Sequence, residues 1–194
     1  MPLKIDFYGN AVQLHLALTL FYFHQLNIND MKTTPTSSRM YGFIVLYEMH
    51  TDFLLRALDG IAEKDKQKRL DTNANHIAWI TGSIVQGRYF LAKSFGINLP
   101  SITDELFANN KGIVDDADYP SLEALIRDWK SISPQLQDAL TQATDEKLEE
   151  KLSMPGMEIT LFEMIGFTTY REANCIGQIA LWRRLLGYAG MNYM

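Results

Sequence analysis

The segment TLFEMIGFTTYREANCIGQIALWRRLLG, residues 160–187, is typical of one long α-helix with defined ends. Its start contains a capping box, because the Thr160 hydroxyl and the Glu163 carboxylate can satisfy each other's exposed backbone amides. The dipeptide Arg183-Arg184 lies in the last turn, where positive charge complements the helix dipole, and Gly187 is a typical stop. The sequence therefore predicts a single helix that begins at the capping box and ends just before Gly187.

Three further stretches show the three- and four-residue spacing of apolar side chains that is typical of amphipathic helices. The first begins at Tyr41. The second begins at a candidate cap, Asn73 or Asn75, and runs to Lys93, and the third begins near Ser121. We find no convincing strand and no internal repeat, so the expected fold class is all-α, a four-helix bundle.

A long acidic segment, residues 97–119, separates the second and third helices. It contains at most a turn of helix near Leu106. Long loops in compact domains often cover a site. We therefore expect a four-helix bundle with a long loop between helices 2 and 3, and such bundles build their sites from inward side chains on facing helices.

Charge and composition exclude several classes of protein. The 194 residues carry a formal charge of −5, which argues against a nucleic-acid partner. The apolar stretch 11–26 is interrupted by polar residues and falls short of the roughly 20 residues that span a bilayer, so no membrane partner is expected. Cys175 is the single cysteine, which suits a reducing compartment and predicts a cytoplasmic location.

The first thirty residues stand apart from the helical pattern. We interpret residues 1–30 as an N-terminal extension of unknown role and residues 31–194 as the bundle domain. The segment MKTTP at residues 31–35 is typical of a polar chain start, so one hypothesis makes Met31 the native initiator. A secretory signal is disfavoured, because no cleavage site of small residues follows the apolar stretch.

Two segments resemble the DinB/YfiT-like family. NHIAWITGS, residues 75–83, is similar to the N-H-I-A-W-x-x-G-H pattern of that family's second helix. REANCIGQIALWRRLLG, residues 171–187, is similar to its fourth helix, H-E-x-x-H-x-G-Q-I followed by R-R-L-L-G. The resemblance implies a DinB-like four-helix bundle, commonly a homodimer, that often binds a divalent metal through three histidines. Some members are thiol-dependent transferases or isomerases.

The resemblance fails at the three metal histidines, whose places are taken by Ser83, Arg171 and Cys175. A divalent metal needs lone pairs, which neutral imidazole offers, whereas a guanidinium has only donors and a permanent positive charge. Serine is a poor ligand, although a cysteine thiolate could still bind. We therefore expect that the family metal is lost, that no cofactor is present, and that these three residues line an altered pocket.

Two other histidines are secondary candidates for this pocket. His50 lies on the apolar stripe of the first helix, and His76 lies seven residues before Ser83, on nearly the same helical face. With Cys175 they would form a mixed nitrogen and sulfur ligand set. The favoured interpretation is structural, with His50 a hydrogen-bonded core residue and His76 part of the helix start.

Two functions are compatible with this sequence. The first is a non-catalytic or regulatory scaffold, for which no catalytic residue can be named. The second is a binder of a small anionic or thiol ligand, or a thiol-dependent transferase or isomerase, that uses Arg171 and Cys175 on one helix face. If Arg171 points inward, its charge needs a partner, either such a ligand or a carboxylate, with Glu48 and Glu163 as candidates.

Overall fold

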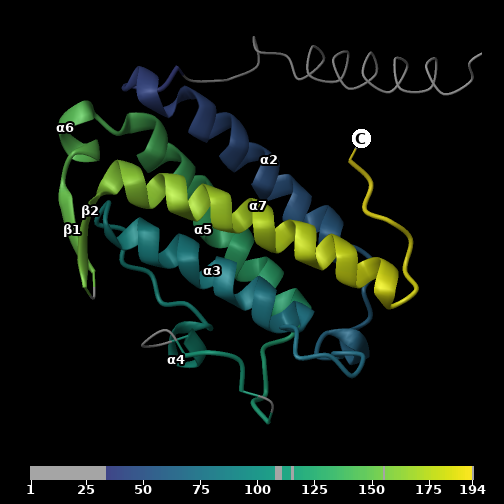
Figure 1. Cartoon of the computed structure of the whole chain (residues 1–194). Helices are drawn as coiled ribbons and strands as arrows, with labels where there is room; N and C mark the ends of the chain where they lie inside the picture. Colours follow the sequence, from purple (N-terminus) through teal and green to yellow (C-terminus); the bar gives the residue numbers. More distant parts are fainter. Residues whose placement is uncertain (1–33, 108–110, 115, 155, 194) are drawn as a thin grey trace, which may run out of the picture. The chain divides into compact units, whose positions relative to one another are not determined.

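The computed structural model describes residues 34–107, 111–114, 116–154 and 156–193 (Figure 1). The interpretation of residues 1–30 and of Met31 as the start lies outside the described residues. Four long helices confirm the predicted all-α four-helix bundle: α2 (Tyr41–Leu58), α3 (Ile77–Lys93), α5 (Leu122–Gln142) and α7 (Leu161–Leu185). The shorter elements are the 3₁₀ turns Ser38–Met40 and Glu63–Asp65, the helices α4 (Asp104–Phe107) and α6 (Asp145–Leu148), and the strands β1 (Lys151–Met154) and β2 (Met157–Thr160).

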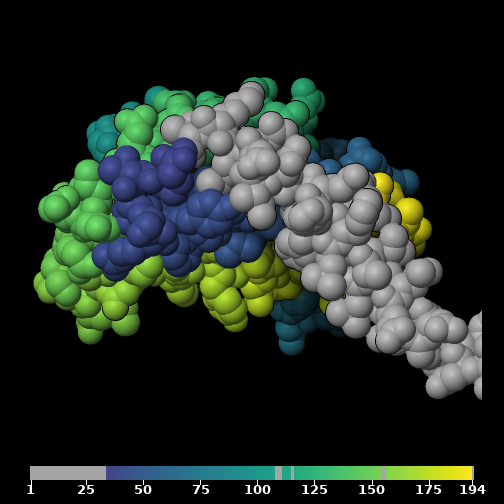
Figure 2. All heavy atoms as spheres, turned by 90° about the horizontal axis from the view of Figure 1, so that it is seen from above, coloured from purple at the N-terminus to yellow at the C-terminus, as the bar shows by residue number. Residues whose placement is uncertain are grey.

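Each long helix packs against two of the others. Helix α2 lies between α5 and α7, as the view in Figure 2 shows, and α3 closes the ring on the other side. The first turns of α2 and α7 meet at Phe43 and Phe162, whose rings lie edge to face. Their last turns meet where Arg183 donates to the carbonyl of Ala57. Helices α2 and α7 therefore run in parallel.

One apolar core fills the space between the four helices. Each helix contributes side chains at three- and four-residue intervals, as the sequence pattern predicts. Trp129 and Trp182 are both buried, and Trp129 is one of the largest side chains in the core. The fully enclosed apolar residues include Leu54, Ala57, Ile77, Leu125, Ile132, Leu136, Leu161 and Ile179.

The predicted capping box opens α7. The Thr160 hydroxyl accepts from the Glu163 amide at 3.1 Å, and the Glu163 carboxylate accepts from the Thr160 amide at 2.7 Å. At the other end, Gly187 adopts a left-handed φ of 86°, which glycine tolerates without strain. Both local signals therefore place the ends of α7 correctly.

The start of α3 differs from the prediction. Neither Asn73 nor Asn75 caps this helix; His76 does, because its Nδ1 accepts from the Trp79 amide at 3.1 Å. A ring nitrogen thus takes the place that an asparagine or serine oxygen usually fills. The helix begins at Ile77, later than we expected.

The long loop between α3 and α5 contains α4 at the position where a turn of helix was predicted. It is tied to α3, because the Thr103 hydroxyl donates to Gln86 at 2.7 Å. The Phe107 ring lies so close to Gly82 that a Cβ added to that glycine would approach it to 2.9 Å. Glycine at position 82 therefore allows the loop to pack directly on α3.

The hairpin β1–β2 corrects our expectation that no strand is present. The strands pair antiparallel, with Lys151 opposite Thr160 and Met154 opposite Met157. Gly156 lies between them with a φ of 82°. Each strand has four residues, too short a run for an alternating pattern to be recognised.

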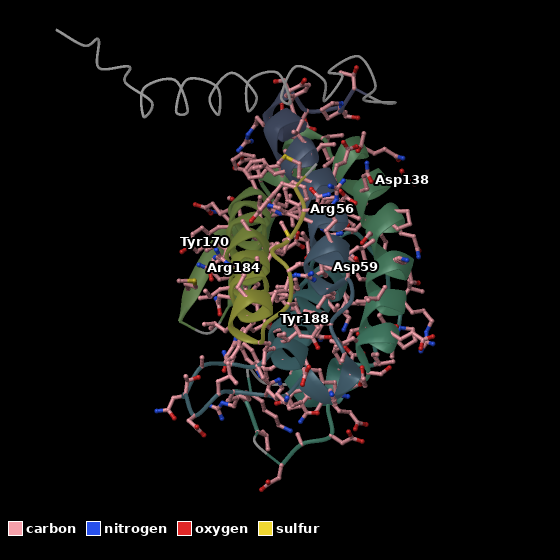
Figure 3. The ribbon with its side chains drawn as sticks, turned by 90° about the vertical axis from the view of Figure 1, so that its right-hand side faces the viewer. Arg56, Asp59, Asp138, Tyr170, Arg184 and Tyr188 are labelled. Atoms are coloured by element: carbon pink, nitrogen blue, oxygen red, sulfur yellow. The ribbon has the colours of Figure 1, made fainter. Side chains whose placement is uncertain are left out.

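Arg183 closes the C-terminal end of α2. Its Nη1 donates to the carbonyls of Ala57 at 2.9 Å and Asp59 at 2.5 Å, groups that have no partner within the helix. The residues after α7 then run back beside α2, as Figure 3 shows. There the Tyr193 ring packs against Phe53 with centroids 5.6 Å apart. Among the described helices, none is long and apolar enough to cross a bilayer.

Candidate functional site

Ser83, Arg171 and Cys175, the positions at which the family resemblance implies metal histidines, meet where α3 packs against α7. These helices run antiparallel, and Ser83 on α3 lies against the thiol of Cys175 on α7. Arg171 lies one turn before Cys175 and packs over Gly87, where an added Cβ would come within 3.3 Å of its Nη1. The structure therefore brings Ser83, Arg171 and Cys175 together.

The Cys175 thiol is buried, with 7% of the residue exposed. Burial raises the pKa of this thiol, the nearby Arg171 and Ser83 oppose that effect, and Glu172 reinforces it. The net pKa is raised, so the thiol is protonated at neutral pH. A protonated thiol is a weak nucleophile and a poor metal ligand.

Arg171 is half-buried, which differs from the fully inward orientation we considered. Neither carboxylate proposed as its partner pairs with it. Glu48 accepts from Gln137 Nε2 at 2.7 Å, and Glu163 is held in the capping box at the start of α7. A half-exposed guanidinium can remain hydrated, so the fold does not require a carboxylate beside it.

A different arginine, Arg88, is fully enclosed and has no exposed surface. It forms a two-point ion pair with Glu172, in which Nε lies 2.7 Å from Oε1 and Nη2 lies 2.9 Å from Oε2. This parallel arrangement is the strongest geometry available to a guanidinium and a carboxylate. The ion pair joins α3 to α7 at the centre of the bundle.

Arg88 also reaches the two remaining helices. Its Nη1 donates to the Thr51 hydroxyl of α2 at 2.8 Å and to the Ser133 hydroxyl of α5 at 2.6 Å. The guanidinium lies between two rings, 3.8 Å from the Tyr47 centroid and 3.5 Å from the Trp129 centroid. Cation–π contact and hydrogen bonds together compensate for its removal from water. One side chain therefore links all four long helices.

His50 is part of the same buried network. Its Nδ1 lies 3.3 Å from Glu172 Oε2, so it faces a carboxylate within the core. Burial by itself would raise the pKa of Glu172, but Arg88 and His50 together outweigh that effect and lower it. Glu172 is therefore ionised, and both of its carboxylate oxygens accept from Arg88.

His76 lies apart from this network, at the start of α3. Besides capping the helix, its ring meets the Tyr119 ring edge to face at 4.7 Å. Seven residues of helix separate it from Ser83, which is about 10 Å along the axis. His50, His76 and Cys175 therefore do not converge as a ligand set.

The residues at the altered site do not fit a divalent metal. A hydroxyl, one thiol and a guanidinium offer no set of three or four converging lone pairs. In the part of the chain that the structure describes, no three His, Cys, Asp or Glu side chains gather in a way that could hold an ion. The chemistry that these residues support is contact with an anion through Arg171.

Our reading of the sequence missed Arg88 and Glu172, although both carry a signal. Arg88 follows Ile84 by four residues and so continues the apolar stripe of its helix. Glu172 lies seven residues after Ile165 and seven before Ile179, both of which are buried. Opposite charges on the inward stripes of two helices indicate a buried ion pair.

Comparison with known proteins shows the fold. No family model matches the chain, and no curated protein sequence matches it. Among solved structures, the chain is similar to a DinB-like protein, YjoA from Bacillus subtilis, with a TM-score of 0.56 and 11% sequence identity. The similarity covers 78% of this chain and 96% of that one. The protein therefore has a DinB-like four-helix fold, with a long loop between α3 and α5.

Proposed function

We propose that this protein is a DinB-like bundle with a degenerate metal site, and that it acts as a non-catalytic or regulatory scaffold. The observation that carries the proposal is the pair Arg171 and Cys175, at the two positions of α7 where the resemblance implies metal histidines. A guanidinium repels a metal cation and offers no lone pair, and the thiol beside it is a single ligand where a metal needs three or four. No metal or other cofactor is part of the proposal.

The buried charges support a structural role as well. A catalytic acid or base needs access to a substrate and a proton to exchange. Glu172 has 2% of its surface exposed and binds Arg88 through both carboxylate oxygens. Arg88 is in turn saturated by Thr51 and Ser133. This network holds the four long helices together.

Further parts of the proposal rest on composition and on the family resemblance. We propose a cytoplasmic protein that forms a homodimer and has no nucleic-acid or membrane partner. The single cysteine supports the cytoplasmic location. The formal charge of −5 argues against a nucleic-acid partner. The dimer follows from the resemblance.

Metal content tests the degenerate site directly. We expect protein purified without chelator to contain far less than one equivalent of zinc, nickel, manganese or iron per chain by elemental analysis. The matched variant carries Ser83→His, Arg171→His and Cys175→His together, which restores three imidazoles, and it should gain metal. Stoichiometric metal in the wild type that is lost in Cys175→Ala would contradict the proposal.

The alternative is a small-molecule binder, or a thiol-dependent transferase or isomerase, that uses Arg171 and Cys175. One observation favours it: Arg171 is half-exposed beside the thiol, and neither Glu48 nor Glu163 neutralises its charge. A thermal-shift screen against thiols and small carboxylates tests it. Stabilisation that depends on ligand and disappears in Arg171→Met would support the alternative over the scaffold.

A further inference from the structure

One face of α7 is exposed along its length and carries almost no charge. We call six of its residues the α7 stripe: Phe167, Tyr170, Asn174, Gly177, Leu181 and Leu185, all exposed. The apolar members are 59%, 68%, 49% and 56% exposed for Phe167, Tyr170, Leu181 and Leu185. The solvent face of a helix in a globular protein is normally polar and charged. The α7 stripe is therefore suited to contact with another protein surface.

Gly177 lies in the middle of this stripe and has no role within the chain that we can identify. An added Cβ there would meet no atom within 4 Å, in contrast to Gly82 and Gly87, which lie against Phe107 and Arg171. Glycine weakens a helix relative to alanine, so its presence on an open face has a cost without an internal benefit. Glycine on a helix surface does allow a second helix to approach closely.

The residues of the stripe are placed almost symmetrically about a centre between Cys175 and Ile176. Tyr170 and Leu181 lie equally far from this centre, and so do Asn174 and Gly177. Two copies of α7 packed antiparallel about that centre would place Tyr170 opposite Leu181 and Asn174 opposite Gly177. Phe167 would then lie within one residue of the position opposite Leu185. A surface that matches itself under a twofold axis fits a second copy of the same chain.

Charge at the ends of α7 favours the same arrangement. Glu163 lies in the first turn, and the exposed Arg184 lies in the last turn. Antiparallel packing would bring the acidic end of each helix to the basic end of the other and would oppose the two helix dipoles. Parallel packing would bring like charges together. Figure 3 labels Tyr170 and Arg184 on this helix.

We infer that the α7 stripe is the surface through which two copies of this chain associate, with the two α7 helices antiparallel and Tyr170 of each opposite Leu181 of the other. This inference rests on the homodimer proposed above and assigns its surface and register. Aromatic rings of one copy pack on leucine side chains of its partner, and Gly177 allows the backbones to approach at the centre.

Engineered cysteines test the register. The double variant Tyr170→Cys/Leu181→Cys should form disulfide-linked dimers under mild oxidation, with the bond between positions 170 and 181 of different chains identified by peptide mass spectrometry. The single variants are matched controls. In the antiparallel register Tyr170 lies about 16 Å along the axis from its counterpart, too far for a disulfide. A 170–170 disulfide in Tyr170→Cys alone would show parallel packing and overturn the inference.

Sedimentation equilibrium tests the surface. We expect wild type and Leu46→Glu to be dimeric and Leu181→Glu to be monomeric at about 50 µM, a concentration chosen to exceed ordinary dissociation constants. Leu46 is the matched control, because it is 40% exposed on α2 and lies outside the stripe. Circular dichroism checks that each variant is folded, and Tyr170→Arg serves as a second stripe variant.

The outcomes separate this inference from the proposals on which it rests. A dimeric Leu181→Glu and a dimeric Tyr170→Arg would overturn the stripe and leave the homodimer in place. A monomeric wild type would overturn both the homodimer and the stripe. Neither result changes the metal content, which tests the degenerate site independently.

Discussion

Arg88 and Glu172 form an ion pair with two short hydrogen bonds, 2.7 and 2.9 Å, in which neither residue is more than 2% exposed. The pair lies next to the altered metal positions but does not share their chemistry. Its charges are balanced inside the core, whereas Arg171, one residue before Glu172, remains half-exposed. Two adjacent residues of α7 therefore have different roles, one in stability and one at the surface of the candidate site.

Removing the guanidinium should destabilise the fold strongly. We expect Arg88→Met to lower the free energy of unfolding by about 3–5 kcal/mol, because Glu172 is left as a buried charge without its partner. Urea denaturation measures the loss. The matched control is Lys147→Met, which breaks the exposed ion pair with Glu150 and should cost far less.

The double variant Arg88→Met/Glu172→Leu separates the charge from the packing. Since it leaves no uncompensated ion, we expect it to be more stable than Arg88→Met alone. The double variant could instead lose as much free energy of unfolding as Arg88→Met and Glu172→Leu lose when their separate losses are added. That result would show that the pair acts through packing and not through charge.

The stability of the protein should fall in acid, because Glu172 then takes up a proton and loses its charge. The folded-state pKa of Glu172 lies below its ordinary value of 4.5, so the folded protein holds the proton less tightly than the unfolded chain does. Its contribution is therefore complete above about pH 4.5 and is lost as the pH falls through the lowered pKa. Urea midpoints measured between about pH 6 and pH 3 should decline more steeply for wild type than for Arg88→Met/Glu172→Leu. Equal slopes in the two proteins would exclude Glu172 as the source.

Cys175 should react slowly with alkylating agents. Burial raises the pKa of the thiol, so the rate at neutral pH should be well below that of an exposed cysteine. The control is Lys130→Cys in a Cys175→Ser background, which places an exposed thiol on α5, outside the α7 stripe. In Arg171→Met the rate should fall further, because the nearby cation that favours the thiolate is gone. A Cys175 that reacts as fast as the control would support the thiol-dependent alternative.

Two glycines should respond to alanine in opposite directions. Gly82→Ala should destabilise the protein, since the new Cβ would lie 2.9 Å from the Phe107 ring and force α4 away from α3. Gly177→Ala should stabilise the isolated chain by about 0.5–1 kcal/mol, because alanine favours helix and the space around it is open. Thermal denaturation at high dilution measures the change in stability of each variant. Destabilisation by Gly177→Ala under those conditions would reveal a contact within the chain.

Local signals predicted much of the fold. The capping box of α7, its stop at Gly187 and the turn of helix at α4 depend on a few neighbouring residues, so the sequence shows them directly. The cap of α3 was predicted wrongly, because an imidazole at position 76 took over the role of Asn73 or Asn75. The hairpin was missed because its strands are too short to show a period.

Ser83, Arg171 and Cys175, which the family resemblance singles out, do lie together between α3 and α7. The sequence did not show how their side chains are oriented. Neighbouring residues of a helix point about 100° apart, however, and spacing alone could not show that Glu172, and not Arg171, turns fully inward. Distinguishing them requires the phase of the buried stripe, which Ile165 and Ile179 define only once they are known to be in the core.

The reach of Arg88 has a consequence for the kinetics of folding. Its partners Thr51, Ser133 and Glu172 lie 37, 45 and 84 residues away along the chain. The complete set of these bonds can form only after all four helices have been brought together, and contacts between residues far apart along the chain are slow to assemble. Interactions that form after the folding barrier has been crossed act chiefly on the unfolding rate. Arg88 should therefore set how long the native bundle persists once formed, while contributing little to how fast it forms.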